Sequence, residues 1–398
     1  MMNTFFQLAS LGALALMPKV ACETTTNTKL CVELEVPVPI NATNQLFDQP
    51  RVDSTIDAID WTVWVSTRTT PPARDRVIGN KTISDTFKIN AQLCVPSDKG
   101  PKADILQIAT PGLGFDKRYF DAEIQPDEYS YVSAALKKGY SILTYDRLGT
   151  GKSQKPDAYE IVQIPTEIEI LASLTKIARS GKLIRSSKVL STGSRTTVSD
   201  FVPSKVVQIG YSFGSFLIQN VLARYPDLGD GAVLTALYPN TIPFDKMIDV
   251  LHYDHEFPKE NDPTRFSEYG SGYFVLSNEA DLQKLFFQKR SLDPALLTYT
   301  EKIKQPETLG EYASEGLSSY LVADNFRGPV QFFIGEFDNF VCRGDCRGIY
   351  DQTEADRIFP HSNATYYLQP NTGHAPGLSK NASAGYEVML EFLDSHNL

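Results

Sequence analysis

Short apolar runs alternate with helical segments from about residue 103 onward. Residues 103–110 (ADILQIAT) and 140–146 (YSILTYD) are apolar runs of strand length, and a helical stretch between them ends at Gly139. Strand, helix and strand at this spacing predict a βαβ unit, in which the two strands lie parallel in one sheet. We therefore expect an α/β fold with a mostly parallel central sheet flanked by helices.

The same alternation continues toward the C-terminus. A helix is predicted over residues 164–181 and a strand over 205–210 (KVVQIG), followed by a helix in which apolar residues recur at i, i+3, i+4 and i+7 from Ile218. Further strands are predicted within residues 328–338 and 364–370, and a last helix with the same buried spacing ends the chain.

Two regions depart from this alternation. Period-two patterns in residues 31–40 and 87–96 predict strands at an antiparallel edge of the sheet. Between residues 241 and 325 the alternation lapses, and we interpret this stretch as a mainly helical insertion. Its aromatic residues are Phe244, Tyr253, Phe257, Phe266, Tyr269, Tyr273, Phe274, Phe286 and Phe287. They would either line an apolar or aromatic pocket or form the insertion's own core, and the sequence leaves both open.

Length and charge narrow the class of protein. A chain of 398 residues can bury one large core with an insertion, or two modest cores. The formal net charge of -10 and the pI near 5.1 argue against nucleic acid or an anionic membrane surface as the main partner. Both of those partners select for clustered Lys and Arg. An acidic, neutral or apolar substrate remains open.

The N-terminus predicts a secretory signal peptide. An uncharged apolar run extends from about Phe5 to Met17 and is followed by Pro18 and small residues. The run is too short to span a membrane comfortably and has the length of a signal sequence. Cleavage is expected after Cys22, with Ala15 as the second choice. We therefore expect a secreted mature chain without an integral membrane span.

Cysteines and glycosylation motifs agree with secretion. Removing the signal leaves an even set of four cysteines, which is typical of disulfides in a secreted protein. The predicted pairs are Cys31 with Cys94 and Cys342 with Cys346. Four N-x-[ST] motifs predict N-glycosylation in the same compartment. Their acceptors are Asn41, Asn80, Asn363 and Asn381.

The strongest chemical signal is GYSFG, residues 210–214, between a predicted strand and a predicted helix. A sharp turn there lifts the hydroxyl of Ser212 out of the sheet, and the flanking glycines permit close packing. The alternative is a turn that serves packing alone. A serine hydroxyl needs a general base to act as a nucleophile at neutral pH, and imidazole has a suitable pKa.

His374, which follows the last predicted strand, is the expected base. The other four histidines are interpreted as surface or insertion residues: His252, His255, His361 and His396. Asp338 is expected to orient the imidazole, because it follows a predicted strand and would emerge at the same sheet edge as Ser212. Glu336 and Asp249 remain rivals for this role.

With these residues in place, the chain resembles the α/β-hydrolase fold family from about residue 103 to the C-terminus. Ser212, Asp338 and His374 follow the family's triad order, and the insertion falls where the family carries its cap. The implied divisions are a signal peptide at 1–22, the first part of the core at 23–240, a cap at 241–325 and the second part of the core at 326–398.

The resemblance also implies an oxyanion hole. One amide comes from the residue after the nucleophile, here Phe213, and the other from the loop TPGLG, residues 110–114. Leu113 is expected to supply the second amide. Gly114 is the nearest alternative, because Pro111 stands where many members have a histidine.

DRLGTGKSQ, residues 146–154, has an ending that is typical of a phosphate-binding loop. That motif needs a glycine where Asp146 stands, and a carboxylate would repel phosphate. The stretch instead resembles the family's D-x-x-G-x-G-x-S loop. We interpret Asp146 as its anchor, the glycines as tight-turn positions and Lys152 as solvated.

These features together predict acyl transfer by a serine hydrolase. Ester hydrolysis is the preferred reaction, with an aminopeptidase-like peptidase or a lactonase on the same triad as the alternative. A non-catalytic binding protein on a hydrolase fold is the alternative from a different class. No metal or organic cofactor is implied, because no cluster of His, Cys and Asp has ligand spacing. We expect a small-molecule or lipid-like ester as substrate and no nucleic-acid partner.

Overall fold

The computed structural model describes residues 29–191, 198, 201–238, 253–315, 317, 320–352 and 355–398. The predicted signal peptide lies outside these residues. Phe244, Asp249 and His252 also lie outside them.

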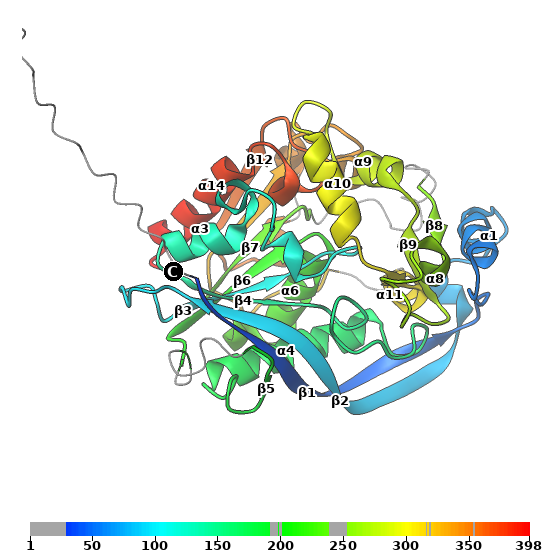
Figure 1. Cartoon of the computed structure of the whole chain (residues 1–398), viewed down its shortest axis with the longest axis horizontal. Coiled ribbons are helices and arrows are strands. Elements are labelled where there is room, and N and C mark those ends of the chain that lie inside the picture. Colours follow the sequence, from blue (N-terminus) through cyan, green and yellow to red (C-terminus); the bar gives the residue numbers. More distant parts are fainter. Residues whose placement is uncertain are drawn as a thin grey trace, which may run out of the picture.

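Within the described residues, one nine-stranded sheet runs through the molecule (Figure 1). Its order is β12-β11-β7-β6-β3-β4-β2-β1-β5. The strands from β12 to β4 pair in parallel, whereas β2, β1 and β5 extend the sheet in antiparallel pairs. The bounds are β1 Leu30–Phe47, β2 Val77–Val95, β3 Ile105–Thr110, β4 Ser141–Tyr145, β5 Lys188–Val189, β6 Lys205–Tyr211, β7 Gly231–Thr235, β11 Val330–Gly335 and β12 Ala364–Gln369. The predicted α/β fold class is thereby confirmed.

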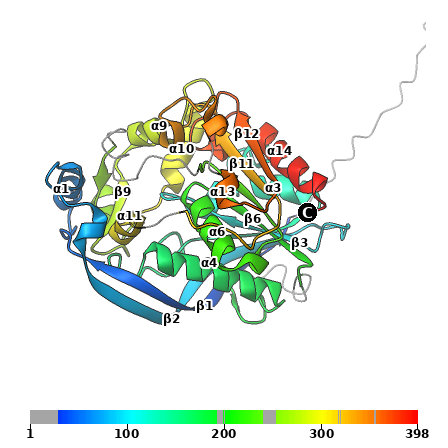
Figure 2. The same cartoon turned by 180° about the vertical axis from the view of Figure 1, so that it is seen from behind.

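Helices cover both faces of the sheet. Helices α3 (Tyr131–Lys137) and α14 (Ala382–Ser395) lie on the face toward the viewer in Figure 1, and α4 (Ile164–Arg179) and α6 (Phe213–Arg224) lie on the face seen in Figure 2. Alternate residues of β6 enter the two apolar clusters, which is the period-two pattern of a strand buried on both faces. Short turns of helix complete the core: η1 Ala73–Arg76, η2 Lys117–Tyr119, α2 Pro126–Tyr129, η3 Pro226–Leu228, α12 Asn339–Cys342, η5 Ile349–Gln352, α13 Ala355–Ile358 and η6 Pro376–Leu378.

The antiparallel edge is a long hairpin. Strands β1 and β2 pair from Leu30 with Val95 to Phe47 with Val77, well beyond the ten-residue runs that the sequence indicated. Helix α1 (Thr55–Ser66) sits at the far end of the hairpin and lies beside the insertion (Figure 1). Its N-cap Ser54 accepts a hydrogen bond from the amide of Asp57. The hairpin thus connects the core to the insertion.

The described part of the insertion contains helices and a small sheet of order β10-β9-β8. Its elements are β8 His255–Glu256, α8 Pro258–Asn261, β9 Tyr273–Leu276, α9 Glu279–Phe286, α10 Pro294–Ile303, β10 Glu307–Thr308 and α11 Leu309–Glu315. The eight predicted aromatic residues that are described here are all buried, with at most 8% exposure. They form the buried packing of the insertion, and Phe266 and Tyr269 also line a cavity together with Asp146 and Lys152.

Candidate active site

Ser212 occupies a strained turn between β6 and α6. Its backbone has φ 51° and ψ -118°, a conformation that costs a non-glycine residue about 1 to 3 kcal/mol. A Cβ atom at Gly210 would lie 2.5 Å from the Cα of Ser215, and one at Gly214 would overlap the carbonyl oxygen of Thr110. Both flanking glycines are therefore required by close packing around the serine.

The structure brings Ser212, His374 and Asp338 into one hydrogen-bonded chain. His374 Nε2 lies 2.8 Å from Ser212 Oγ, and His374 Nδ1 lies 2.7 Å from Asp338 Oδ2. Asp338 is fully buried and His374 is 2% exposed. With Nδ1–H donating to the carboxylate, Nε2 is left to accept the serine proton. The catalytic roles of these residues stay a prediction.

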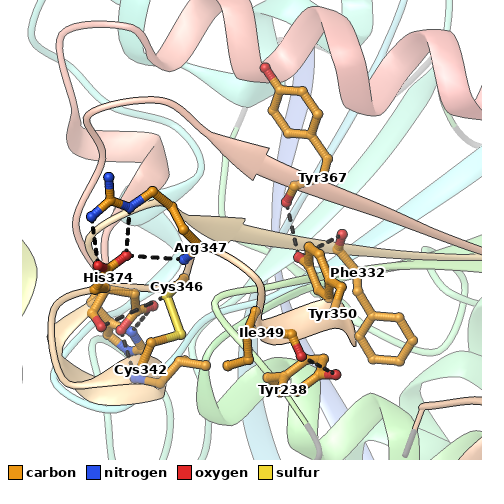
Figure 3. The surroundings of a disulfide bond; sticks show 12 residues. Tyr238, Phe332, Cys342, Cys346, Arg347, Ile349, Tyr350, Tyr367 and His374 are labelled. Atoms are coloured by element: carbon orange, nitrogen blue, oxygen red, sulfur yellow. Dashed lines mark hydrogen bonds and ion pairs between the residues drawn. A yellow bond between two sulfur atoms is a disulfide. The ribbon is translucent and has the colours of Figure 1, made fainter. Parts of the chain in front are cut away.

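Asp338 is fixed by the loop that follows β11. Its Oδ1 accepts a hydrogen bond of 2.8 Å from the amide of Val341, at the start of α12. Its carbonyl accepts one of 3.1 Å from the amide of Cys342, which is disulfide-bonded to Cys346. Figure 3 shows His374 close to this disulfide loop. The loop therefore holds the carboxylate through both its side chain and its backbone.

Glu336, the rival acid that the structure describes, is engaged away from the imidazole. Glu336 Oε2 accepts a hydrogen bond of 2.8 Å from the amide of Asn371, in the loop that carries His374. Asp249 lies outside the described residues. The geometry therefore favours Asp338 over Glu336 as the partner of His374.

The other described histidines lie away from Ser212. His255 is buried in the insertion, where its Nε2 lies 3.7 Å from Glu307. His361 lies 3.5 Å from Asp324, and the Nδ1 of His396 lies 2.9 Å from the carbonyl of Phe392. None of these three contacts the serine.

The loop of residues 110–114 lies directly against the serine. A Cβ atom at Gly112 would lie 2.9 Å from the Tyr211 ring and 3.1 Å from the Cβ of Ser212, so a side chain there would crowd both residues. Gly114 has φ +72°, and its carbonyl accepts a hydrogen bond of 2.9 Å from the amide of Gln305. Among the described residues, the amides of Leu113 and Phe213 donate no backbone hydrogen bond. Both are therefore available to an oxyanion, and this role stays a prediction.

Asp146 holds together the loop of residues 146–154. Its side chain accepts hydrogen bonds from the backbone amides of Lys117 and Lys152, and the ammonium of Lys117 lies 2.9 Å from Oδ2. Gly149 and Gly151 have φ +84° and +50°, which glycine adopts without strain. The Lys152 side chain is largely exposed and reaches Glu33 at 2.8 Å. The loop is thus built as a scaffold, as the sequence indicated.

Arg147 is a buried residue that no pattern in the sequence indicated. Its Nη1 contacts the carboxylate of Glu167 at 2.7 Å and that of Glu311 at 2.5 Å. Its Nη2 lies 3.4 Å from the carbonyl of Gly112, and its guanidinium stacks over the Phe213 ring at 4.9 Å. Arg147 therefore touches both segments that would form the oxyanion hole. The contacts of Arg147 are with residues distant in the sequence, so the motif of residues 146–154 alone could not reveal its role.

Removing the Arg147 charge is expected to destabilise the fold. Arg147→Met would leave Glu167 and Glu311 facing one another in the interior. Burial already raises the pKa of Glu167 to about 8, with Arg147 opposing this rise and the charge of Glu311 adding to it. Losing one partner of a buried ion pair costs about 3 to 5 kcal/mol. Urea unfolding followed by circular dichroism measures the loss.

Arg179→Met is the matched control, because Arg179 pairs with Asp230 at 2.5 Å while both side chains stay partly exposed. Exposed pairs contribute about 0 to 1 kcal/mol. Equal losses in the two variants would contradict the expected role of Arg147.

Both predicted disulfides, Cys31–Cys94 and Cys342–Cys346, are present. Three predicted glycosylation acceptors are exposed: Asn41, Asn80 and Asn363. Asn381 is half-buried, and its Nδ2 donates to the carbonyl of Pro370 at 2.8 Å, so its amide is already engaged.

Two kinds of feature are absent from the described ranges. No group of three or more His, Cys, Asp or Glu residues there is arranged to hold a metal ion. No helix in that part of the chain combines the length and apolarity needed to cross a membrane.

Comparisons with known proteins bear on the fold. No protein-family model matches the chain, and no curated protein matches its sequence. An esterase from Thermogutta terrifontis, described as thermophilic and malate-bound, aligns with a TM-score of 0.51 and 12% identity, covering 87% of this chain and 99% of that one. A structure described as an alpha/beta hydrolase fold protein from Chitinophaga pinensis gives a TM-score of 0.46 and 15% identity, over 77% of this chain and 94% of that one. At these identities the likeness concerns the fold alone.

Proposed function

Because the chain has the α/β-hydrolase fold, we propose that it is a serine hydrolase that cleaves carboxylic esters through an acyl-enzyme. The observation that carries the proposal is the hydrogen-bonded chain from Ser212 through His374 to Asp338 at a strained turn. A structural role alone would need neither the strained backbone at Ser212 nor a buried carboxylate behind the imidazole. Strain of this kind persists where the surrounding structure enforces it, and it clusters at active sites.

The geometry supports a two-step acyl transfer. Ser212 Oγ attacks the carbonyl carbon as His374 Nε2 takes its proton, and Asp338 stabilises the resulting imidazolium. The amides of Leu113 and Phe213 bind the oxyanion of the tetrahedral intermediate. The intermediate collapses, and His374 returns the proton to the departing alcohol. Water then repeats the sequence on the acyl-enzyme, which releases the acid and restores Ser212.

A secreted, glycosylated enzyme with residues 241–325 as its cap is part of the same proposal. Two disulfides fit an oxidising compartment, and three of the four glycosylation acceptors are exposed. An aminopeptidase-like peptidase or a lactonase would use the same three residues. A binding protein on this fold would have no need for the full hydrogen-bonded chain, which favours an enzyme.

A fluorophosphonate probe tests the proposed function. We expect the probe to label the purified protein at Ser212, located by peptide mass mapping, because a triad serine attacks phosphorus as it attacks a carbonyl carbon. Absence of labelling would contradict the hydrolase proposal.

Substrate panels then separate the reaction types. p-Nitrophenyl esters of rising chain length are expected to be hydrolysed faster than aminoacyl anilides or lactones. Turnover confined to the anilides would replace the esterase proposal with a peptidase.

A further inference from the structure

Glu307, in β10 of the insertion, is a buried carboxylate that the proposed mechanism does not use. It is 3% exposed, yet it lies beside the oxyanion loop: a Cβ atom at Gly114 would be 2.9 Å from its Oε1. Its charge also reaches Tyr211, which directly precedes Ser212. Burial, together with Tyr119 and the charges of Asp338 and Glu307, raises the pKa of Tyr211. Glu307 is therefore close to the reaction centre.

The two oxygens of Glu307 have different surroundings. Oε2 accepts a hydrogen bond from the hydroxyl of Tyr312 and lies 3.7 Å from His255 Nε2. Among the described residues no hydrogen bond to Oε1 is present. Some polar side-chain atoms are inaccessible to solvent and also lack a hydrogen-bond partner, such as an oxygen of Glu315. Glu307 Oε1 does not belong to this group. One oxygen is thus held in place while the other borders accessible space beside Gly114.

The interior around this carboxylate is already crowded with carboxyl groups. Glu167 and Glu311 share the guanidinium of Arg147, and burial together with the charge of Glu311 raises the pKa of Glu167 to about 8. Burial, with the charges of Glu311 and Glu307, raises the pKa of Glu315 to about 8. A buried carboxylate oxygen without a hydrogen-bond donor, such as Oε1, is costly. A cationic group on a ligand would remove that cost at Glu307, whereas a second anion would increase it.

We propose that Glu307 binds a protonated amine on the substrate, so that the site selects esters that carry an ammonium group near the scissile carbonyl. This inference rests on the proposed function. A charge-assisted hydrogen bond from the ammonium to Oε1 would hold the substrate beside the oxyanion loop. The positive φ of Gly114 and its lack of a side chain leave room for this contact. Aminoacyl esters are the simplest compounds of this class.

A matched pair of substrates tests the inference. L-Leucine p-nitrophenyl ester and 4-methylpentanoic acid p-nitrophenyl ester differ only in the amine, and at about pH 6.5 this amine is protonated. After division by the uncatalysed hydrolysis rate of each ester, the wild-type protein is expected to favour the leucine ester by about tenfold to hundredfold in kcat/KM, because a hydrogen bond to a charged group has that value. This comparison depends on no variant. A wild-type protein without such a preference would overturn the inference.

Glu307→Gln then assigns the preference to the residue. The amide keeps the shape and can still accept from Tyr312, so the ratio of the two kcat/KM values is expected to fall by about tenfold to hundredfold, mainly through KM. Glu279→Gln is the control, since it removes a carboxylate from the exposed start of α9 in the same insertion. The control is expected to keep the wild-type ratio.

Two outcomes of the Glu307→Gln experiment would overturn the inference without contradicting the proposed hydrolase function. Equal losses on both esters in Glu307→Gln would mean that Glu307 positions the loop and binds no amine. An unchanged ratio would mean that the amine binds elsewhere. Fluorophosphonate labelling shows whether each variant is folded and whether its Ser212 is reactive. Only a wild-type protein that is not labelled would contradict the proposed hydrolase function.

Discussion

Ser212→Ala is expected to lower kcat for p-nitrophenyl esters by about a millionfold and to abolish fluorophosphonate labelling. The alanine removes the only oxygen that His374 Nε2 contacts at 2.8 Å, so the imidazole would have no nucleophile to activate. The backbone strain at this position is unchanged, because alanine cannot relieve a positive φ. Initial rates at saturating ester measure the loss. The variant should also retain about a thousandfold advantage over water, from the oxyanion amides and from substrate binding.

Ser215→Ala is the matched control for this change. Ser215 lies one helical turn away in α6, and its Oγ donates to the carbonyl of Thr235 at 2.8 Å. Losing this hydrogen bond should cost stability, by about 1 kcal/mol, and leave labelling intact. Labelling that survives in Ser212→Ala, or that disappears in Ser215→Ala, would move the nucleophile away from Ser212.

Local patterns predicted the strands of the parallel part of the sheet, the turn at Ser212 and the position of His374. Residues 206–210 are uniformly apolar or neutral, and the glycines of GYSFG mark a turn that only small residues can make. The chain has five histidines, so position after a strand selected His374. Each of these conclusions depends on neighbours within a few residues, which is the range over which a sequence pattern carries information.

Contacts between distant segments could not be predicted in this way. Arg147 meets Glu311 across 164 residues, and Glu307 meets the loop at Gly114 only because the insertion folds back over the core. The length of the hairpin of β1 and β2 was underestimated for a related reason. Beyond Ile40 its side chains are more polar, and the pairing is maintained by the partner strand.

The choice between Glu336 and Asp338 shows the same limit at a finer scale. Both acids follow β11, and two residues apart on a strand they would share one face. The strand ends at Gly335, however, and the amide of Asp338 returns to the carbonyl of Gly335 at 3.2 Å. This tight turn separates the two side chains. Glu336 reaches the amide of Asn371, while Asp338 reaches His374.

Asp338→Asn is expected to lower kcat by about ten-thousandfold while leaving the fold intact. The asparagine oxygen can still accept from the amide of Val341, so the cap of α12 survives. An amide cannot stabilise the imidazolium of His374, and it presents a donor that favours the wrong tautomer. Glu336→Gln is the control and should change kcat only slightly, because that carboxylate contacts a backbone amide. Steady-state kinetics measures kcat, and thermal melts check that each variant is folded. Near-normal turnover in Asp338→Asn, or an equal loss of turnover in both variants, would contradict the assignment.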